Sequence, residues 1–532
     1  MIDGEADIVI VGAGSAGCVL ANRLSADPGR RVVLLEAGGP AWHPFTKIPA
    51  GYAKILAHKR LTWGFSTEPE AGLDGRALPY PRGRVLGGSS AINGLGYVRG
   101  DPYDFQLWTQ MGARGWSFDE LLPFYKRSER SEGGENRGTD GELPVAHLLD
   151  RPPVLEAMVK AAETVGVPFN PDMNGPHRDG VSWFQQTRRG HLRASAADAF
   201  LRPVRGRPNL RVLTGVLALG LEVRDGRATG VRIRRNGTDE VVRARQEVVL
   251  SAGAVGSPHL LLLSGIGPAA QLRAHGIEPV LDLPGVGENL QDHFYVRMSW
   301  TLASHRWSAN KRIHGWRLGV EAARWALSKG GPLSWSAGML AVYARTEPGL
   351  PAPDVHIVAG PVSWALGRPG VPGDEPGMTL GVWPTRPFSR GTVSLRSADP
   401  ADAPAIAPRF LSDPLDHGPI VRGMRLARQW ASAAPMAGIV SREREPGPAT
   451  DSDEELLAFA RRVGGTVYHP CGTVRMGGPD APLDEALRVR GIEGLRVVDA
   501  SVFPTVPSAN INATVLAVAE KASDLIRARD RR

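Results

Sequence analysis

The sequence predicts an α/β fold, with a Rossmann-like domain and a second, discontinuous α+β domain built on an antiparallel sheet. Three observations support this prediction. A glycine fingerprint stands between a buried strand and a helix near the N-terminus, residues 210–250 alternate between apolar and polar side chains, and a buried strand from residue 495 ends in an acid near the C-terminus. The chain is therefore expected to leave the first domain and later return to it.

The fingerprint consists of Gly12, Gly14 and Gly17. It follows the apolar run Ile8–Val11, which predicts a buried parallel strand, and it opens the helix expected over residues 16–24. The first glycine permits a tight turn, the second lets the backbone approach a pyrophosphate, and the third lets helix and strand pack closely. The helix N-terminus would then hold the pyrophosphate. This pattern predicts a dinucleotide site, with a purely structural glycine turn as the alternative.

Glu36 ends the second strand, which we expect over residues 31–35. A carboxylate at this place can hold both hydroxyls of a ribose. A ribose 2′-phosphate would be repelled by it, which disfavours NADP. FAD and NAD both fit, and the fingerprint alone does not choose between them.

Composition narrows the class of protein. With 532 residues, 42% hydrophobic and 22% charged, the chain resembles an ordinary globular protein of about two to four domains. The net charge of +8 comes mostly from scattered arginines, so we expect no nucleic-acid partner. Cys18 and Cys471 lack neighbours that would indicate a metal site or a disulfide framework, so no metal is expected.

The sequence shows no targeting or membrane segment. The chain enters its first strand without the features of a signal peptide. Its most apolar stretch, around Leu260–Leu263, is interrupted by Pro258, Ser264 and Gly265, well short of the ~18 apolar residues that span a bilayer. We expect no integral membrane segment and a cytoplasmic protein, with peripheral attachment to the inner membrane left open.

The middle of the chain indicates the second domain. Residues 128–141 read as a polar surface loop, residues 154–165 as a helix, and residues 210–250 as hairpin strands. Eight of the thirteen tryptophans lie between Trp300 and Trp430. We assign residues 1–155, 191–300 and 460–532 to the nucleotide-binding domain, and residues 156–190 and 301–459 to a substrate-binding domain.

Three further segments carry chemical information. Residues 82–100 contain six glycines, which leave backbone amides open to a flat or anionic ligand. Residues 253–267 predict a turn, a helix begun by Pro258 and a glycine stop. The third segment combines Tyr-His-Pro-Cys-Gly at residues 468–472 with the Asn-rich turn at residues 499–514.

These segments resemble the signatures of the glucose-methanol-choline (GMC) oxidoreductases, a family of FAD-dependent enzymes that oxidise alcohols. The first family signature can be followed from Gly83 to Gln106 and the second from Gly253 to Gly267, and residues 284–293 and 389–391 are also similar. The resemblance covers nearly the whole chain. It implies a FAD-binding domain of the glutathione-reductase type and a bacterial dehydrogenase of the alcohol, choline or sorbose kind.

The resemblance implies FAD as the cofactor, bound without a covalent bond, because Ile92 stands where some members carry a flavin-linked histidine. The expected FAD contacts are Gly12, Gly14, Ser15, Ala16, Gly17, Glu36, Ala37, Trp63, Arg82, Val85, Gly87, Gly88, Asn93, Gly94, Leu95, Gly96, Ala218, Asp499, Ala500 and Asn512. The first residues of this set hold the ADP half, and Arg82 to Gly96 run beside the ribityl chain and the isoalloxazine.

The resemblance also implies a catalytic pair, His469 and Asn510, with hydride transfer from the alcohol to flavin N5. An alcohol with a pKa near 15.7 facing an imidazole of about 6.5 leaves a mismatch of roughly 9 units, on the order of 12 kcal/mol. Full alkoxide formation by His469 is therefore too costly, and proton transfer must accompany hydride loss. Asn510 can only orient the substrate oxygen. Cys471 is expected to serve packing rather than chemistry.

The substrate and the electron acceptor stay open at this point. Aromatic walls with few charges would suit an uncharged primary or sugar alcohol, and no acid stands out as a partner for choline. We expect a small-molecule alcohol as substrate and a quinone or carrier as acceptor. An oxidase that transfers electrons to O2 is the first alternative, and an FAD-containing hydroxynitrile lyase is the second.

Overall fold

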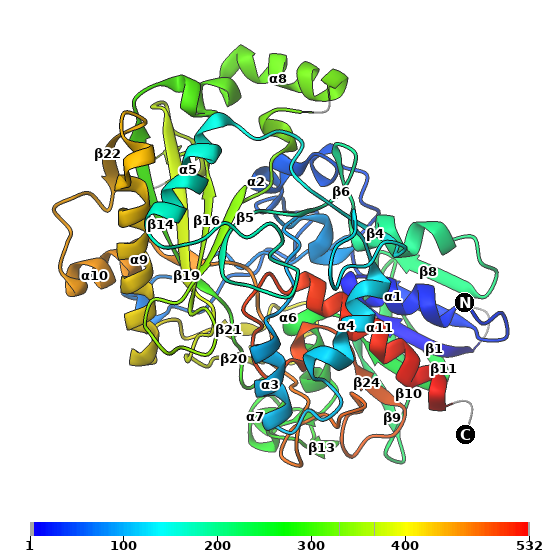
Figure 1. Cartoon of the computed structure of the whole chain (residues 1–532). Coiled ribbons are helices and arrows are strands. Elements are labelled where there is room, and N and C mark those ends of the chain that lie inside the picture. Colours follow the sequence, from blue (N-terminus) through cyan, green and yellow to red (C-terminus); the bar gives the residue numbers. More distant parts are fainter. Residues whose placement is uncertain (1–4, 329, 366–367, 530–532) are drawn as a thin grey trace.

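The computed structural model describes residues 5–328, 330–365 and 368–529. Figure 1 shows two halves: strands β1, β11 and β24 with helices α1 and α11 lie near both chain ends, and β14, β16, β19 and α9 lie on the opposite side. The helices are α1 Ser15–Leu24, α2 Tyr52–Ile55, α3 Pro102–Gln110, α4 Phe118–Ser128, α5 Pro153–Thr164, α6 Gly253–Leu263, α7 Ala269–Ala274, α8 Gly315–Ser328, α9 His417–Ser432, α10 Asp453–Val463 and α11 Asn512–Arg529. The strands are β1 Ala6–Val11, β2 Val32–Glu36, β3 Glu129–Arg130, β4 Leu143–Ala146, β5 Gly180–Trp183, β6 Gln186–Arg189, β7 Leu192–Arg193, β8 Leu210–Thr214, β9 Val216–Arg224, β10 Arg227–Arg235, β11 Thr238–Leu250, β12 Ile266–Gly267, β13 Leu281–Asp282, β14 Phe294–Leu302, β15 Leu340–Ala344, β16 Val355–Gly360, β17 Trp364–Ala365, β18 Arg368–Pro372, β19 Gly377–Pro384, β20 Thr392–Ser394, β21 Ala405–Ala407, β22 Val440–Glu445, β23 Gly465–Thr466 and β24 Leu495–Val497.

The first sheet has the order β8-β2-β1-β11-β10-β9, and β24 pairs with β11 on the side. Strands β8, β2, β1, β11 and β24 are parallel, whereas β10 and β9 add on as antiparallel hairpins. All residues of β1 and β2 are buried, as expected of parallel strands covered on both faces. The C-terminal strand β24 therefore completes the sheet that the N-terminus begins, as the sequence predicts.

The second sheet is antiparallel and has the order β22-β14-β19-β16-β15-β5, with β23 beside β14. Helix α9 packs against β14, β16 and β19 and covers one face of this sheet. The predicted domain boundaries stay a prediction. Three of them would divide single elements, because the boundary after residue 155 lies inside α5, the one after residue 300 inside β14 and the one after residue 459 inside α10.

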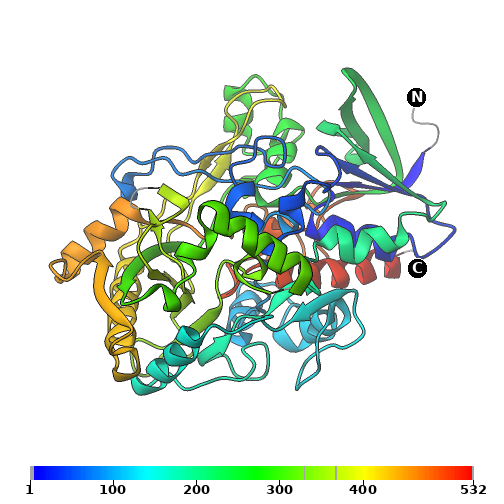
Figure 2. The same cartoon turned by 90° about the horizontal axis from the view of Figure 1, so that it is seen from above.

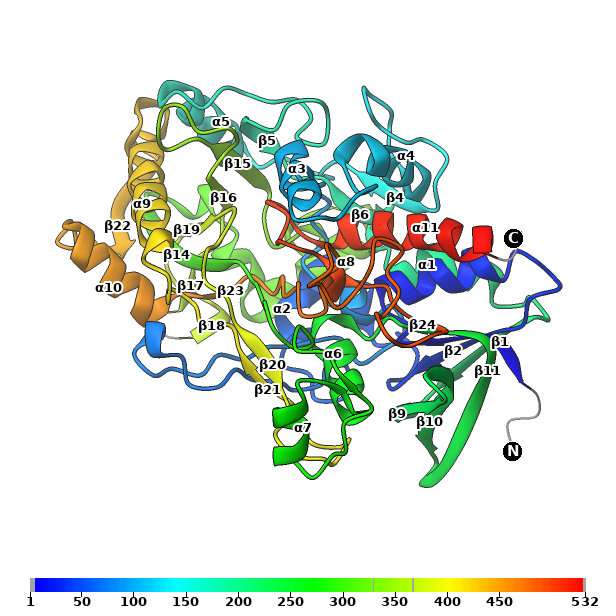
Figure 3. The same ribbon diagram turned by 90° about the horizontal axis from the view of Figure 1, so that it is seen from below.

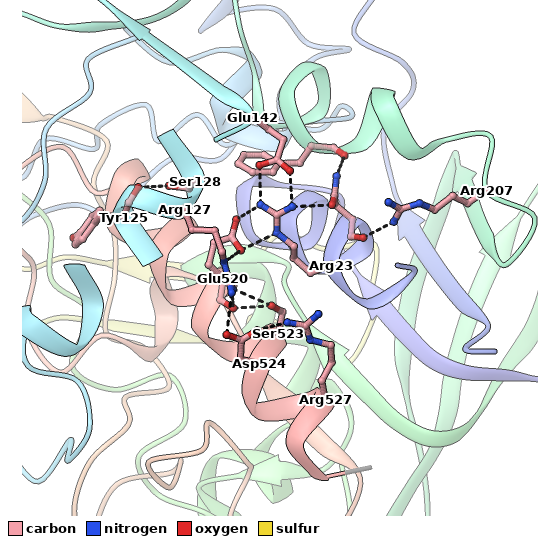
Figure 4. A network of polar contacts seen from close by, with 12 residues as sticks. Arg23, Tyr125, Arg127, Ser128, Glu142, Arg207, Glu520, Ser523, Asp524 and Arg527 are labelled. Atoms are coloured by element: carbon pink, nitrogen blue, oxygen red, sulfur yellow. Dashed lines mark hydrogen bonds and ion pairs between the residues drawn. The ribbon is translucent and has the colours of Figure 1, made fainter. Parts of the chain in front are cut away.

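Helices α1 and α11 run side by side although they are separated by almost the whole sequence (Figures 2 and 3). Arg23 of α1 donates to Glu142 and to Glu520 of α11, which is fully buried, and Arg127 of α4 also pairs with Glu520 (Figure 4). At the other end of the helices, the Ser15 hydroxyl donates to Asn512 Oδ1 over 2.6 Å. Contacts at both ends of α1 thus fix the returning chain to this helix.

Three local expectations differ from the structure. Strand β8 is not part of a hairpin but pairs with β2 in parallel. Residues 128–141 are not simply a surface loop, because Glu129 is fully buried between the guanidinium groups of Arg99 and Arg137. Helix α6 begins at Gly253 and contains Pro258 inside it. The carbonyl of Ala254, four residues before this proline, accepts from Thr473 Oγ1 over 2.7 Å instead, since proline has no N–H to donate.

Candidate active site

A cavity of about 1310 Å³ lies between the ends of β1 and β2 in the first sheet and strands β14, β16 and β19 of the second sheet. It is lined by His469 and Asn510 and by many of the expected FAD contacts. Those that line it are Gly12, Gly14, Ser15, Ala16, Glu36, Ala37, Trp63, Arg82, Gly88, Asn93, Gly94, Gly96, Ala218, Asp499, Ala500 and Asn512. His469, Asn510 and the glycine fingerprint therefore face one continuous space.

Four of the expected contacts lie behind the wall of the cavity: Gly17, Val85, Gly87 and Leu95. A Cβ atom at Gly17 would come within 1.9 Å of the Gly12 carbonyl oxygen, so this glycine serves the packing of helix on strand. The Gly87 N–H donates to the Ala13 carbonyl over 2.8 Å. Val85 and Leu95 are fully buried. These residues support the loops that carry the lining residues.

The fingerprint loop fits a pyrophosphate. Gly12 adopts φ +99°, and a Cβ atom there would lie 2.5 Å from the Ser251 carbonyl oxygen, so only glycine fits. At Gly14 the nearest such neighbour is 3.9 Å away, which leaves the start of α1 open to the cavity. Helix α1 has no side-chain cap, so its first N–H groups are available to an anion.

Glu36 lies at the end of β2, as the sequence predicts, and lines the cavity. Its carboxylate accepts from the N–H groups of Ala13 (3.0 Å) and Gly38 (2.8 Å). Burial raises the pKa of Glu36 to about 7, although these two hydrogen bonds favour the ionised form. The carboxylate is held rigidly where the adenosine ribose of a dinucleotide would lie.

Asp499 is buried and its side chain is fully occupied within the protein. It accepts from Gly253 N–H (2.8 Å), Ser257 Oγ (2.5 Å), and the N–H and hydroxyl of Ser501 (2.8 and 2.6 Å). Any contact of Asp499 or Ala500 with a cofactor would therefore come from the backbone. The side chain instead ties the start of α6 to the segment after β24.

His469 belongs to a chain of hydrogen bonds that defines where its proton lies. His293 Nε2 is 2.9 Å from the Thr385 carbonyl oxygen, which can only accept, so this nitrogen carries the proton of a neutral ring. His293 Nδ1 must then accept, and it lies 3.0 Å from His469 Nδ1. His469 is therefore protonated on Nδ1, and its Nε2 is left with a free electron pair.

Burial also keeps His469 neutral. It lowers the pKa of His469 well below its usual value, with a further contribution from His293, and it lowers the pKa of His293 to about 4. Asn510 Nδ2 lies 3.1 Å from His469 Nε2, and Asn510 Oδ1 has no partner within the described residues. The arrangement presents an unprotonated nitrogen and an amide to the same point of the cavity.

Asp292, next to His293, positions this pair without facing the cavity. Its Oδ1 accepts from the backbone N–H of His469 over 2.8 Å, and its Oδ2 accepts from the hydroxyls of Tyr80 (2.7 Å) and Thr466 (2.5 Å). Residues 284–293 resemble the family in sequence, but the resemblance implied no role for Asp292 or His293. The two histidines come together because residues 291–295 pair with residues 465–471.

Strands β14, β16 and β19 of the second sheet line the far side of the cavity. Trp383 of β19 lies there, and Trp335 and Trp364, which belong to other segments, also line the cavity, whereas Trp300 and Trp430 are core residues. Contrary to the expectation of a pocket with few charges, Arg297 on β14 also lines the cavity. Arg297 could not be singled out from the sequence, because it precedes the tryptophan-rich segment that indicates the substrate-binding domain.

Two residues singled out in the sequence take no part in covalent chemistry here. Ile92 lines the cavity and is almost fully buried, so this position offers no nucleophile to a flavin. Cys471 lies outside the cavity lining, and burial raises the pKa of its thiol well above the usual value. Among the described residues, no group of His, Cys, Asp and Glu is placed to hold a metal ion, and no helix is long and apolar enough to cross a bilayer.

Comparison with known proteins identifies the family. Two profiles described as GMC oxidoreductase match residues 6–295 and 387–519. An oxygen-dependent choline dehydrogenase from Rhizobium johnstonii is 42% identical over 531 residues, which cover 98% of this chain and 95% of the relative.

Solved structures agree with this result. Pyridoxine 4-oxidase from Mesorbium loti superposes with a TM-score of 0.89 at 34% identity, covering 98% of this chain and 99% of the other. A variant of Aspergillus oryzae RIB40 formate oxidase reaches a TM-score of 0.93 at 28% identity and covers all of both chains. The resemblance, the fold class and FAD as the cofactor are thereby confirmed. The chain belongs to the GMC oxidoreductase family and is an FAD-dependent alcohol oxidoreductase.

Proposed function

We propose that the protein oxidises a primary or sugar-type CH–OH group to an aldehyde or ketone, with His469 as the base and Asn510 as the positioning amide. The observation that carries this proposal is the pair of hydrogen bonds that His293 makes with the Thr385 carbonyl and with His469 Nδ1. Together they leave Nε2 of His469 unprotonated in the cavity. Bound FAD would supply the two-electron acceptor for the hydride.

The residues of the chain would act in a defined order. The substrate hydroxyl replaces the Asn510 amide as the donor to His469 Nε2, and the amide then donates to the substrate oxygen. As the C–H bond breaks, the hydroxyl proton passes to Nε2. The imidazolium so formed is stabilised through Nδ1 by His293, which accepts its hydrogen bond.

For the electron acceptor we propose a quinone. Helix α8 contributes Leu318 and Ala322 to the cavity wall and exposes Trp316 (75%) and Leu327 (85%) to solvent. The apolar side chains that this amphipathic helix exposes beside the cavity suit a lipid-soluble acceptor better than a small gas. The names of the relatives favour O2 as the alternative. Peroxide formed during turnover in air would support the oxidase. Re-oxidation of the reduced flavin by a soluble quinone, without peroxide formation in air, would support the dehydrogenase.

Choline is a candidate because the curated relatives carry that name. Among the described residues, the cavity is lined by three carboxylates: Glu36 in the fingerprint region, Asp499, whose oxygens are already taken, and Asp402. Asp402 interacts with His259 of α6, away from the second sheet. Among the described residues, the cavity therefore has no carboxylate beside His469 that could attract a quaternary ammonium group.

One anaerobic experiment tests the proposal. The holoenzyme is mixed with a panel of alcohols, and loss of the flavin absorbance near 450 nm is followed. We expect bleaching with at least one alcohol. Absence of bleaching with every alcohol, combined with cleavage of a cyanohydrin, would instead indicate the lyase. Precipitation with acid should release FAD into the supernatant if the cofactor is noncovalent.

A further inference from the structure

Arg297 contributes a positive charge to the substrate side of the cavity. It lies on β14, where residues alternate between the core and the cavity: Val296 and Met298 are fully buried, and Tyr295 and Arg297 line the cavity together with His469. The side chain is mostly removed from water. A buried guanidinium needs a counter-charge or several hydrogen bonds to be stable.

The protein supplies little of this compensation. Arg297 Nη2 donates to the Tyr295 hydroxyl over 2.5 Å, and the guanidinium carbon lies 5.6 Å from the centre of the same ring. In the described part of the chain, Arg297 forms no ion pair with a carboxylate. Glu445, which pairs with the same strand, accepts from Ser299 over 3.0 Å.

The phenols around Arg297 do not neutralise it. Tyr52 and Tyr468 also line the cavity and interact electrostatically with Arg297. Burial raises the pKa of Tyr52 to about 12 and raises that of Tyr468 above its usual range, so both hydroxyls keep their protons at neutral pH. The cluster therefore combines one uncompensated cation with neutral hydroxyl groups that can donate hydrogen bonds.

Beside this cluster, a glycine keeps the wall of the cavity open. Gly381 pairs with Arg297 across β14 and β19 and also lines the cavity. A Cβ atom at Gly381 would stand 3.4 Å from the Tyr295 ring, so a larger side chain would fill the space beside the phenol. Space remains for a ligand group between the strands and the catalytic pair.

We propose that Arg297, with Tyr52, Tyr295 and Tyr468, binds the carboxylate of the substrate, so that the enzyme oxidises a hydroxy acid to an oxo acid. A planar guanidinium matches a carboxylate with two parallel hydrogen bonds, and its single charge matches that of one carboxylate. The inference rests on the proposed function: the hydroxyl proton passes to His469 Nε2, and the C–H hydrogen leaves with its electron pair. It adds the substrate class.

The wild-type holoenzyme tests this first. Straight-chain ω-hydroxycarboxylates of three to eight carbons, the diols of equal length and choline are compared by anaerobic flavin reduction. We expect the best hydroxycarboxylate to exceed its diol in kcat/KM at least tenfold, and hexanoate to inhibit diol oxidation competitively. A diol or choline that matches or exceeds every hydroxycarboxylate would overturn the inference and leave the proposed function intact. If no alcohol reduces the flavin, the proposed function itself falls.

Variants then assign the effect to Arg297. Arg297→Gln should lower the ratio of kcat/KM for hydroxycarboxylate over diol roughly a hundredfold and abolish inhibition by hexanoate, and Arg297→Lys should restore part of the ratio. The matched control is Arg442→Gln on β22, whose side chain is 58% exposed and pairs with Glu375; it should leave the ratio unchanged. FAD content is measured for each variant. An unchanged ratio in both Arg297 variants would contradict the inference.

Discussion

His469 Nδ1 lies 3.0 Å from His293 Nδ1, and this contact determines the tautomer of the proposed catalytic base. Because His293 donates through Nε2 to the Thr385 carbonyl, its Nδ1 must accept from His469 Nδ1–H when both rings are neutral. His469 Nε2 is then unprotonated. The base is thus prepared by a residue that does not line the cavity.

Removing the acceptor nitrogen of His293 should slow flavin reduction. In His293→Phe the His469 Nδ1–H loses its buried partner, a cost of about 1–3 kcal/mol, and reduction should slow roughly tenfold to a hundredfold. His293→Asn can place an oxygen near the lost Nδ1 and should recover part of the rate. Stopped-flow traces of both variants, with FAD content and pH profiles, check this. Equal rates for wild type and His293→Phe would refute the role of His293.

FAD affinity should depend on pH through Glu36. Burial raises the pKa of Glu36 to about 7, so this carboxyl becomes protonated as the pH falls through 7 and can then no longer accept from both ribose hydroxyls. FAD should therefore bind several-fold more weakly at pH 6 than at pH 8. Titration of the FAD-free protein at both pH values measures the difference. Glu36→Gln should bind weakly at both, and an equally strong pH dependence in that variant would show that another group is responsible.

The buried ion pairs of Glu520 should stabilise the packing of α11 on α1. Glu520→Gln leaves the guanidinium groups of Arg23 and Arg127 without their shared partner and should lower the free energy of unfolding by about 3 kcal/mol. The control, Asp239→Asn, breaks an exposed pair with Arg234 and should leave the free energy of unfolding nearly unchanged. Urea denaturation of the holoproteins compares the two. A similar small loss in both would mean that the network adds little.

The fold and the cofactor end of the site follow from local sequence. Gly12, Gly14 and Glu36 are recognisable because their roles depend on the strand and helix that immediately adjoin them. The proposed catalytic pair, His469 and Asn510, required the family resemblance, since a single histidine and asparagine carry no local signal.

Other residues escaped prediction because their environment is made by distant segments. His293 comes next to His469, and Arg297 lines the cavity, only once residues 291–302 pair with β19 and with residues 465–471. Glu129 reads as a loop acid, yet it is buried because Arg99 and Arg137 converge on it. The partners of His293 and Arg297 are far away in the sequence, and alternation along β14 was the only local hint for Arg297. Glu129 is buried by Arg137, which is 8 residues away, and by Arg99, which is 30 residues away.

The most direct test of the account is the rate of flavin reduction by an alcohol substrate in His469→Ala, measured anaerobically by stopped flow beside wild type. With the base removed and FAD still bound, the rate should fall by about three orders of magnitude or more. His469→Ala that binds FAD and is reduced as fast as wild type would contradict the proposed role of His469.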